Sequence, residues 1–203
     1  MKNFVVTLFA AAAFAACKKN EAPQTDKPVV STETPAPVES GTVINDSANI
    51  PNKQGKDHLL SDQDKKFADA AARGGQMEVM MGKLAETNAS NPAVKSLGAM
   101  MVTDHSKANE ELKQIASALH YMLPSSLDTE KQKKYDDLKA KKGSDFDKAY
   151  ADLMVKDHKE DIEEFKKEAS KGTEPSLKSF AAKTLPTLEH HLKESEKANN
   201  TVK

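Results

Sequence analysis

The chain has 203 residues, with 30 basic and 31 acidic side chains and a formal net charge of −1 at pH 7. Because the two signs are interleaved, the sequence predicts no basic surface for nucleic acid, and charge indicates no protein partner. Helix-forming residues dominate, Trp is absent and β-branched residues are sparse after Ile50, which favours an all-α fold. Apolar periodicity is confined to the part after about residue 60, so one folded domain is expected.

The first 17 residues resemble the signal peptide of a bacterial lipoprotein. Lys2 precedes an apolar stretch, Phe4–Ala16, that is too short for a permanent membrane span. The segment from Phe14 to Cys17 is similar to a lipobox, in which the cysteine is lipidated and the chain is cut before it; Phe14 stands where Leu is usual. As the only cysteine, Cys17 has no intramolecular disulfide partner. We predict a lipid anchor at Cys17, in the cell envelope at the periplasmic side of the outer membrane.

Residues 18–60 mix prolines with Ser, Thr and charged side chains and show no helical period. This composition is typical of a disordered tether. A flexible chain of this length has an r.m.s. reach of roughly 35–40 Å, so the folded domain is expected to stand off its membrane.

Residues 61–200 are predicted to form one bundle of four long helices and a short extra helix in the connection between the second and third long helices. Ser61 is an N-cap with an acid three residues later, Pro92 suits a first helical position, and Ser144 suits a further cap. Gly143 is expected to end the short helix, and Pro186 lies inside the last one. The predicted helices span residues 62–88, 92–119, 128–142, 144–171 and 175–199.

Two segments of the chain carry one pattern. Residues 95–117 and 148–170 both contain Met-Val-x-Asp-His, followed by Glu-Glu and then Ala-Ser. The start of the second long helix also resembles the start of the last one. The economical interpretation is one helical hairpin used twice, joined by a connection of about twenty residues that is long enough to cross the bundle.

Each long helix places one ionisable residue on its apolar stripe: Glu78, His105, His158 and His191. Counted from the helix starts, all four lie roughly 13 to 16 residues in, so they share a level to within about one turn. Three imidazoles and a carboxylate suit a transition metal such as Zn, Cu, Fe or Mn. The alternative is a metal-free polar layer, in which Glu78 accepts hydrogen bonds from the imidazoles.

Asp104 and Asp157 each precede one of these histidines and lie at the edge of the stripe. They are candidates for supporting the layer from outside. A di-iron oxidase centre is not expected, because Val102, Val155 and Leu188 occupy the positions where Glu-x-x-His motifs need glutamate. The chain also lacks a Ser-His-Asp, Cys-His, phosphate-loop or Cys-x-x-Cys motif, so the sequence predicts no enzyme.

The ordered motifs resemble the DUF4142 family of bacterial envelope proteins. The resemblance covers about residues 62–198 and rests on Asn-Pro-x-Val-Lys at 91–95, the two Met-Val-x-Asp-His segments, Leu123-Pro124, and Leu-Pro-Thr-Leu at 185–188 followed by His191-Leu192. It implies a ferritin-like four-helix bundle in the envelope, and it implies no established activity. Two functions therefore stay open: an envelope lipoprotein that binds a transition metal in its bundle core, or a non-catalytic structural or interaction module with a metal-free core layer.

Overall fold

The structure is a computed structural model that describes residues 60–203. Within this part of the chain there are five helices and no strand: α1 (Asp62–Asn88), α2 (Pro92–Ala118), α3 (Thr129–Lys139), α4 (Gly143–Lys171) and α5 (Pro175–Thr201). The predicted all-α fold, with a short helix in the long connection, is confirmed. The predicted signal peptide, Cys17 and nearly all of the predicted tether lie outside the described residues. None of the described helices combines the length and hydropathy that a membrane span requires.

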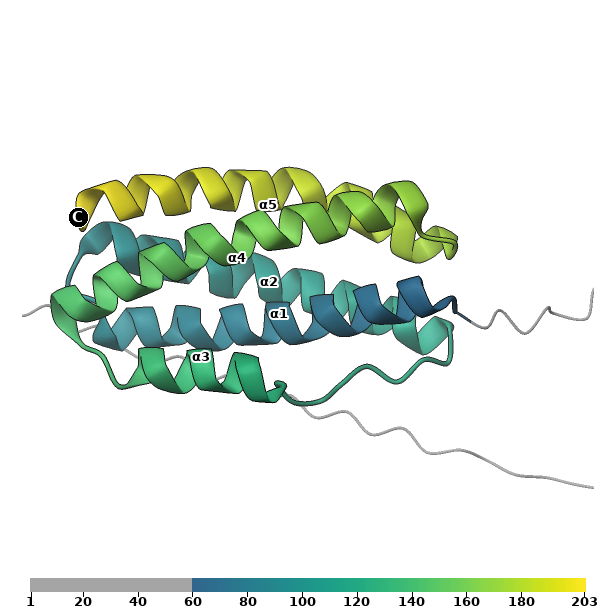
Figure 1. The fold of residues 1–203 in the computed structure, drawn as a ribbon, viewed down its shortest axis with the longest axis horizontal. Coiled ribbons are helices and arrows are strands. Elements are labelled where there is room, and N and C mark those ends of the chain that lie inside the picture. The colour runs from purple at the N-terminus through teal and green to yellow at the C-terminus, as the bar shows by residue number, and fades with distance from the viewer. Residues whose placement is uncertain (1–59) are drawn as a thin grey trace, which may run out of the picture. The chain divides into compact units, whose positions relative to one another are not determined.

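The four long helices form two antiparallel hairpins, α1 with α2 and α4 with α5 (Figure 1). Helix α2 and helix α4 run in the same direction, so the connection between them returns along the bundle, and α3 lies against α1 on the way. Helix α1 also packs on α4, and α2 on α5, which gives every long helix two antiparallel neighbours. This is the crossover arrangement of a ferritin-like bundle.

Two aspartates join the hairpins at opposite ends of the bundle. Asp64 of α1 accepts hydrogen bonds from the backbone N–H of Thr173 (2.9 Å) and of Glu174 (3.3 Å), at the start of α5. Asp147 of α4 accepts from the backbone N–H of Ser90 (3.1 Å) and of Asn91 (2.9 Å), at the start of α2. Asn91 and Glu174 are the N-caps of α2 and α5, so each hairpin holds the backbone at the start of the other hairpin's second helix.

Two predicted helix starts are wrong by a residue. Helix α4 begins at Gly143 and not at Ser144. The short helix begins at Thr129 and not at Asp128, and it ends at Lys139 and not at Lys142. Gly143 has a φ of +58°, a left-handed conformation that suits glycine, so it turns the chain into α4 where it was expected to end α3. No side chain caps α4, because its N-cap residue, Lys142, has no hydrogen-bond acceptor in its side chain.

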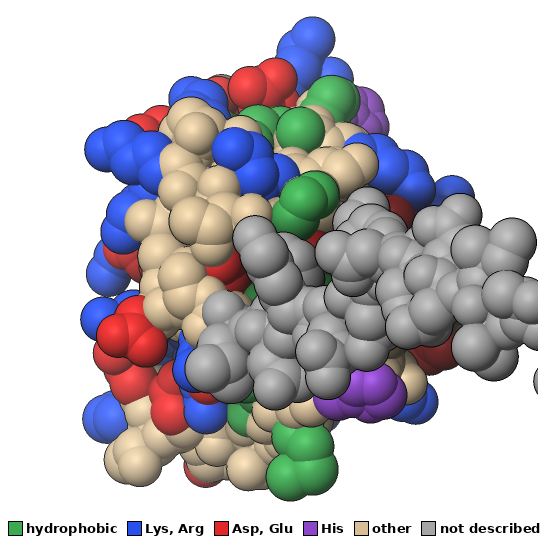
Figure 2. Space-filling view, turned by 90° about the vertical axis from the view of Figure 1, so that its right-hand side faces the viewer, with side chains coloured by type: hydrophobic (Ala, Val, Ile, Leu, Met, Phe, Trp, Pro, Cys, Tyr) green, Lys and Arg blue, Asp and Glu red, His purple; other side chains and the backbone are tan. Residues whose placement is uncertain are grey.

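The apolar core consists of two clusters with a polar layer between them. One contains Met77, Met81, Met101, Tyr150 and Met154; the other contains Phe67, Leu112, Phe165, Phe180 and Leu188. His105 of α2 and His158 of α4 lie between the stretches of their helices that contribute to the two clusters, and Glu78 and His191 lie close to the same boundary on α1 and α5. At the outside, Figure 2 shows basic and acidic side chains interspersed over the end of the bundle where α1 begins, as the interleaved charges of the sequence predict.

Candidate metal centre

Three buried histidines from three helices meet in the middle of the bundle. His105 of α2, His158 of α4 and His191 of α5 are 6%, 0% and 0% exposed. One ring nitrogen of each lies within 4.8 Å of one nitrogen of both others. The distances between ring centroids are 5.6, 5.1 and 5.3 Å. The helical spacing that put one histidine on each stripe thus brings the three rings to one level.

Hydrogen bonds on the outer side hold each ring in place. His158 Nδ1 lies 3.0 Å from the backbone carbonyl of Met154, and His191 Nε2 lies 2.8 Å from Asp104 Oδ2. Carbonyl and carboxylate oxygens only accept, so these two nitrogens carry the protons and donate. His158 Nε2 and His191 Nδ1 are therefore left with their lone pairs.

These two lone-pair nitrogens face each other at 3.3 Å. Two acceptors at this distance repel each other unless a proton or a cation lies between them. A tetrahedral ion that binds imidazole at about 2.0–2.1 Å holds two ring nitrogens about 3.3 Å apart. The observed separation matches the distance expected between two ligands of one tetrahedral metal ion.

The third ring, His105, is arranged in the same way as the other two. His105 Nδ1 lies 3.0 Å from Glu78 Oε2 and donates a hydrogen bond to this oxygen when the carboxylate is ionised. The other nitrogen, His105 Nε2, is buried and makes no hydrogen bond within the described part of the chain. Each of the three imidazoles thus directs one nitrogen to an oxygen outside the group and keeps the other free. Histidine ligands of metals are oriented by outer oxygen acceptors of this kind.

The electrostatics keep the three rings neutral. Burial lowers the pKa of His105 well below its usual value, and the neighbouring His158 and His191 lower it further. Burial, together with His191, lowers the pKa of His158 to about 4. Burial also lowers the pKa of His191, against the opposing effect of Asp104. At neutral pH all three are uncharged, which is the form that coordinates metals.

Glu78 lies beside the three rings but is not one of the converging groups. Its Oε2 contacts His105 Nδ1, and its Oε1 lies 3.5 Å from His158 Nδ1. The latter contact is not a hydrogen bond, because the proton on His158 Nδ1 points to Met154, and Oε1 is left without a partner. Burial raises the pKa of Glu78 well above its usual value, and the carboxylates of Asp161 and Asp157 add to this effect. The predicted fourth ligand thus lies where it orients His105.

The two predicted supporting aspartates behave differently. Asp104 supports a histidine, but that histidine is His191 on another helix and not its neighbour His105. The expectation for Asp157 is wrong: its Oδ1 lies 3.2 Å from Lys134 Nζ on α3, and it makes no hydrogen bond to an imidazole. The carbonyl of Met154 takes the place expected for Asp157. The sequence could not have indicated this acceptor, because every residue carries a backbone carbonyl.

The comparisons with known proteins agree with the fold. Residues 50–198 match the model of a family described as "Domain of unknown function (DUF4142)". A DUF305 fragment from Deinococcus radiodurans is similar in structure, with a TM-score of 0.62 at 9% identity over 70% of this chain and 98% of that one. CopM in its Cu(II)-bound form has a TM-score of 0.58 at 14% identity, over 68% of this chain and 96% of that one.

CopM in its Cu(I)-bound form is similar to the same extent, with a TM-score of 0.57 at 16% identity, over 68% of this chain and 96% of that one. At these identities the likeness is one of fold. No curated protein matches the sequence. The family model covers most of the chain, and its bounds contain all four long helices up to Ala198. The chain therefore belongs to the DUF4142 family.

Proposed function

We propose that this protein binds one transition-metal ion through His105, His158 and His191, and that the ion is copper. The observation that carries the proposal is the pair of lone-pair nitrogens, His158 Nε2 and His191 Nδ1, held 3.3 Å apart by outer hydrogen bonds. A buried, unpartnered His105 Nε2 supplies a third nitrogen. In this proposal the bundle holds an ion and carries out no reaction of its own.

The donor set narrows the choice among Zn, Cu, Fe and Mn. Imidazole suits copper, zinc and iron, whereas manganese prefers oxygen ligands, and no carboxylate is among the converging atoms. Monovalent copper accepts three nitrogen ligands and carries a single charge, so it loses less hydration energy than a divalent ion on entering an apolar core. The shared fold of CopM, which has been solved with Cu(I), Cu(II) and Ag, supports copper as the first ion to test.

The sharpest test is metal analysis of the purified, tag-free chain after loading with Cu(I), Cu(II), Zn, Fe or Mn. We expect one copper per chain, lost in the triple variant His105→Leu, His158→Leu, His191→Leu. The matched control is His190→Gln, because His190 is exposed beside His191 and should leave the stoichiometry unchanged. If no metal binds at stoichiometric level under any loading condition, the metal-free alternative stands, and the bundle is a structural or interaction module.

The metal-free alternative requires a different placement of the protons on His158 and His191. One of the two facing rings would have to give up its outer hydrogen bond and donate a proton across the 3.3 Å contact. Nitrogen chemical shifts of the imidazoles report this directly. Protons on His158 Nδ1 and His191 Nε2 support the metal proposal, and a proton on either facing nitrogen supports the alternative.

We further propose that the protein is an envelope lipoprotein, anchored at Cys17 to the periplasmic side of the outer membrane, with residues 18–60 as its tether. The support is the lipobox-like segment ending at Cys17 and the proline-rich composition that follows it. Labelled palmitate should enter the wild type and not Cys17→Ser. Labelling of the variant would disprove the anchor.

A further inference from the structure

A small cavity lies beside His105, one of the three histidines. Its volume is about 20 Å³, enough for one water-sized particle. Its polar lining comprises Glu78, His105, Asn109, Asp161 and Thr184, and apolar side chains such as Leu112 close the rest. Two buried atoms at this lining, His105 Nε2 and Glu78 Oε1, have no hydrogen-bond partner. An ion that enters the bundle would therefore reach His105 from this cavity.

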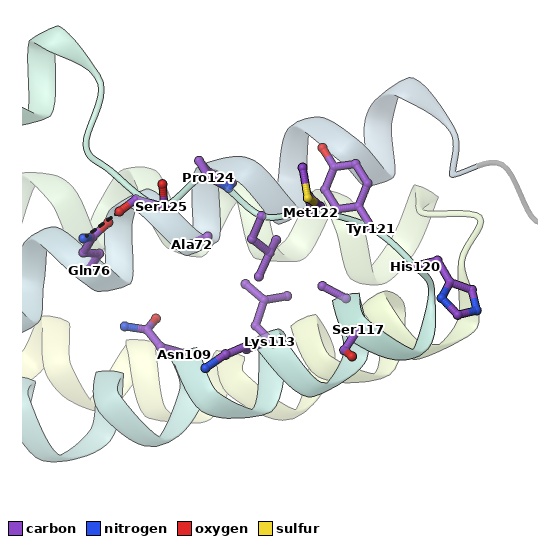
Figure 3. A pocket seen from close by; sticks show the side chains of 13 residues that line it. Ala72, Gln76, Asn109, Lys113, Ser117, His120, Tyr121, Met122, Pro124 and Ser125 are labelled. Atoms are coloured by element: carbon purple, nitrogen blue, oxygen red, sulfur yellow. Dashed lines mark hydrogen bonds between the residues drawn. The ribbon is translucent and has the colours of Figure 1, made fainter.

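A much larger groove opens at the surface nearby. It has a volume of about 870 Å³ and lies between α1, α2 and residues 120–125 of the connection. Figure 3 shows Ala72 and Gln76 of α1 facing Asn109 of α2 across it, with Gln76 hydrogen-bonded to the backbone of Ser125. The groove is open to solvent and reaches down to the packed faces of α1 and α2.

Groove and cavity share two lining residues, Asn109 and Leu112. Asn109 lies one helical turn after His105, and the amide of Asn109 packs directly on the backbone of Gly75, where an added Cβ would overlap it. Glycine at 75 thus makes room for the carboxamide, which stands between the outer groove and the inner cavity. The side chain is half-buried and has no hydrogen bond to another described residue, so no bond holds it in this place.

We propose that the metal ion enters and leaves through this groove, and that Asn109 controls the rate of its passage. The proposal rests on the proposed metal function. Oxygen-bearing side chains line the cavity together with His105, namely the Asn109 amide and the Asp161 and Glu78 carboxyl groups, so they can replace hydration water before His105 binds.

A second groove offers a comparison. It has a volume of about 540 Å³ between α2 and α5, is lined by residues that include Leu97, Met100 and His190, and shares no lining residue with the cavity. Of these two grooves, only the one at Asn109 adjoins the cavity. Met100 is partly buried on the same helix as Asn109, so trimming it is a matched control for general loosening of α2.

The test is stopped-flow measurement of Cu(I) uptake and of its release to a chelator, on the full chain. Asn109→Ala should speed both by about tenfold and leave the Kd unchanged, because only the barrier is lowered. Asn109→Phe should slow both, since the adjoining groove has space for the ring. Met100→Ala should match wild type. The proposal is overturned if Asn109→Ala changes neither rate, if it changes the Kd instead, or if Met100→Ala speeds uptake equally.

A metal-free readout separates this proposal from the proposed function. Deuterium exchange at the ring carbon between the two nitrogens of His105, followed by mass spectrometry, reports how readily solvent reaches the cavity. Asn109→Ala should accelerate this exchange, with Met100→Ala as control. If wild type binds no metal, the proposed function fails, while the His105 exchange rate still decides whether Asn109 closes the passage. Equal exchange in wild type and Asn109→Ala overturns the route.

Discussion

Asp104 and His191 are 87 positions apart in the sequence, yet Asp104 Oδ2 lies 2.8 Å from His191 Nε2, across the contact between α2 and α5. This hydrogen bond fixes which nitrogen of His191 faces the other two rings. Loss of an oriented outer partner of this type costs about 10–100-fold in metal affinity.

Asp104→Asn should therefore weaken copper binding by about 10–100-fold without unfolding the bundle. The amide either fails to accept the His191 proton strongly or donates to that nitrogen and favours the wrong tautomer. Competition with a chelator measures the Kd. Asp157→Asn is the matched control, because Asp157 occupies the same place in the repeated Asp-His dipeptide but pairs with Lys134. Equal weakening in both variants would contradict the assigned role of Asp104.

The His158→Leu variant separates the metal-bound from the metal-free layer. Without metal, two facing lone pairs destabilise the core, so the variant should unfold at the same urea concentration as wild type or a higher one. With copper at about 100 times the Kd, wild type should gain about 2.7 kcal/mol, and the variant should gain nothing. A metal-free hydrogen-bonded layer predicts instead a loss of about 1–3 kcal/mol in the variant, whatever the copper concentration.

Glu168 gives the fold a pH dependence away from the histidines. Burial raises its pKa to about 7, and the hydrogen bond to Asp64 adds to the increase. The folded state therefore holds a proton that the unfolded chain, with a carboxyl pKa of about 4.3, releases. This contribution to stability is present below about pH 4.3 and is lost as the pH rises to about 7.

Glu168→Gln should accordingly be more stable than wild type at pH 8 and differ little from it near pH 4. Urea unfolding of both proteins at the two pH values measures the change. Glu164→Gln, at an exposed position of the same helix, should show no such dependence. A Glu168→Gln effect that is the same at both pH values would show that the substitution acts through packing and not through the proton.

The aspartates that join the hairpins should each matter to stability. Asp147→Ala leaves the N–H groups of Ser90 and Asn91 without their acceptor, and Asp64→Ala does the same for Thr173 and Glu174. We expect a loss of about 1–3 kcal/mol for each, measured by urea unfolding. Because the two sites lie at opposite ends of the bundle, the losses should add to within about 0.5 kcal/mol in the double variant. Losses below about 0.3 kcal/mol would mean that solvent replaces these bonds at no cost.

Much of this architecture was predictable because a helix with one apolar face repeats every 3.6 residues. That period marked Glu78, His105, His158 and His191 as inward-facing, and Ser61 and Pro92 marked helix starts correctly. The period says nothing about how far each helix is rotated about its axis relative to its neighbours. That rotation decides that Asp104 reaches His191, that Glu78 meets the outer nitrogen of His105, and that Asp157 turns to Lys134.

Asp161 and Asn109 were missed for the same reason. Both lie outside the strict apolar stripe, and only the packed structure places them on the cavity. The Gly74-Gly75 pair was the available signal, because a glycine leaves room for a neighbouring helix. Gly75 lets the Asn109 amide lie on the backbone of α1.

The hydrogen bonds that Asp64 and Asp147 make to the opposite hairpins fix how far each helix lies along its neighbour, and this fixes the geometry at the centre of the bundle. If α5 slid along α1 by one turn, about 5.4 Å, Asp64 would lose Thr173, and the same slip would carry His191 away from His158. A slip of α2 along α4 would likewise separate Asp147 from Asn91 and His105 from the other two rings. An apolar core alone tolerates such displacement, because one ridge of aliphatic side chains packs much like the next. The aspartate contacts at the two ends of the bundle exclude this displacement. They therefore determine the distances between the three ring nitrogens in the middle, about half a bundle length away.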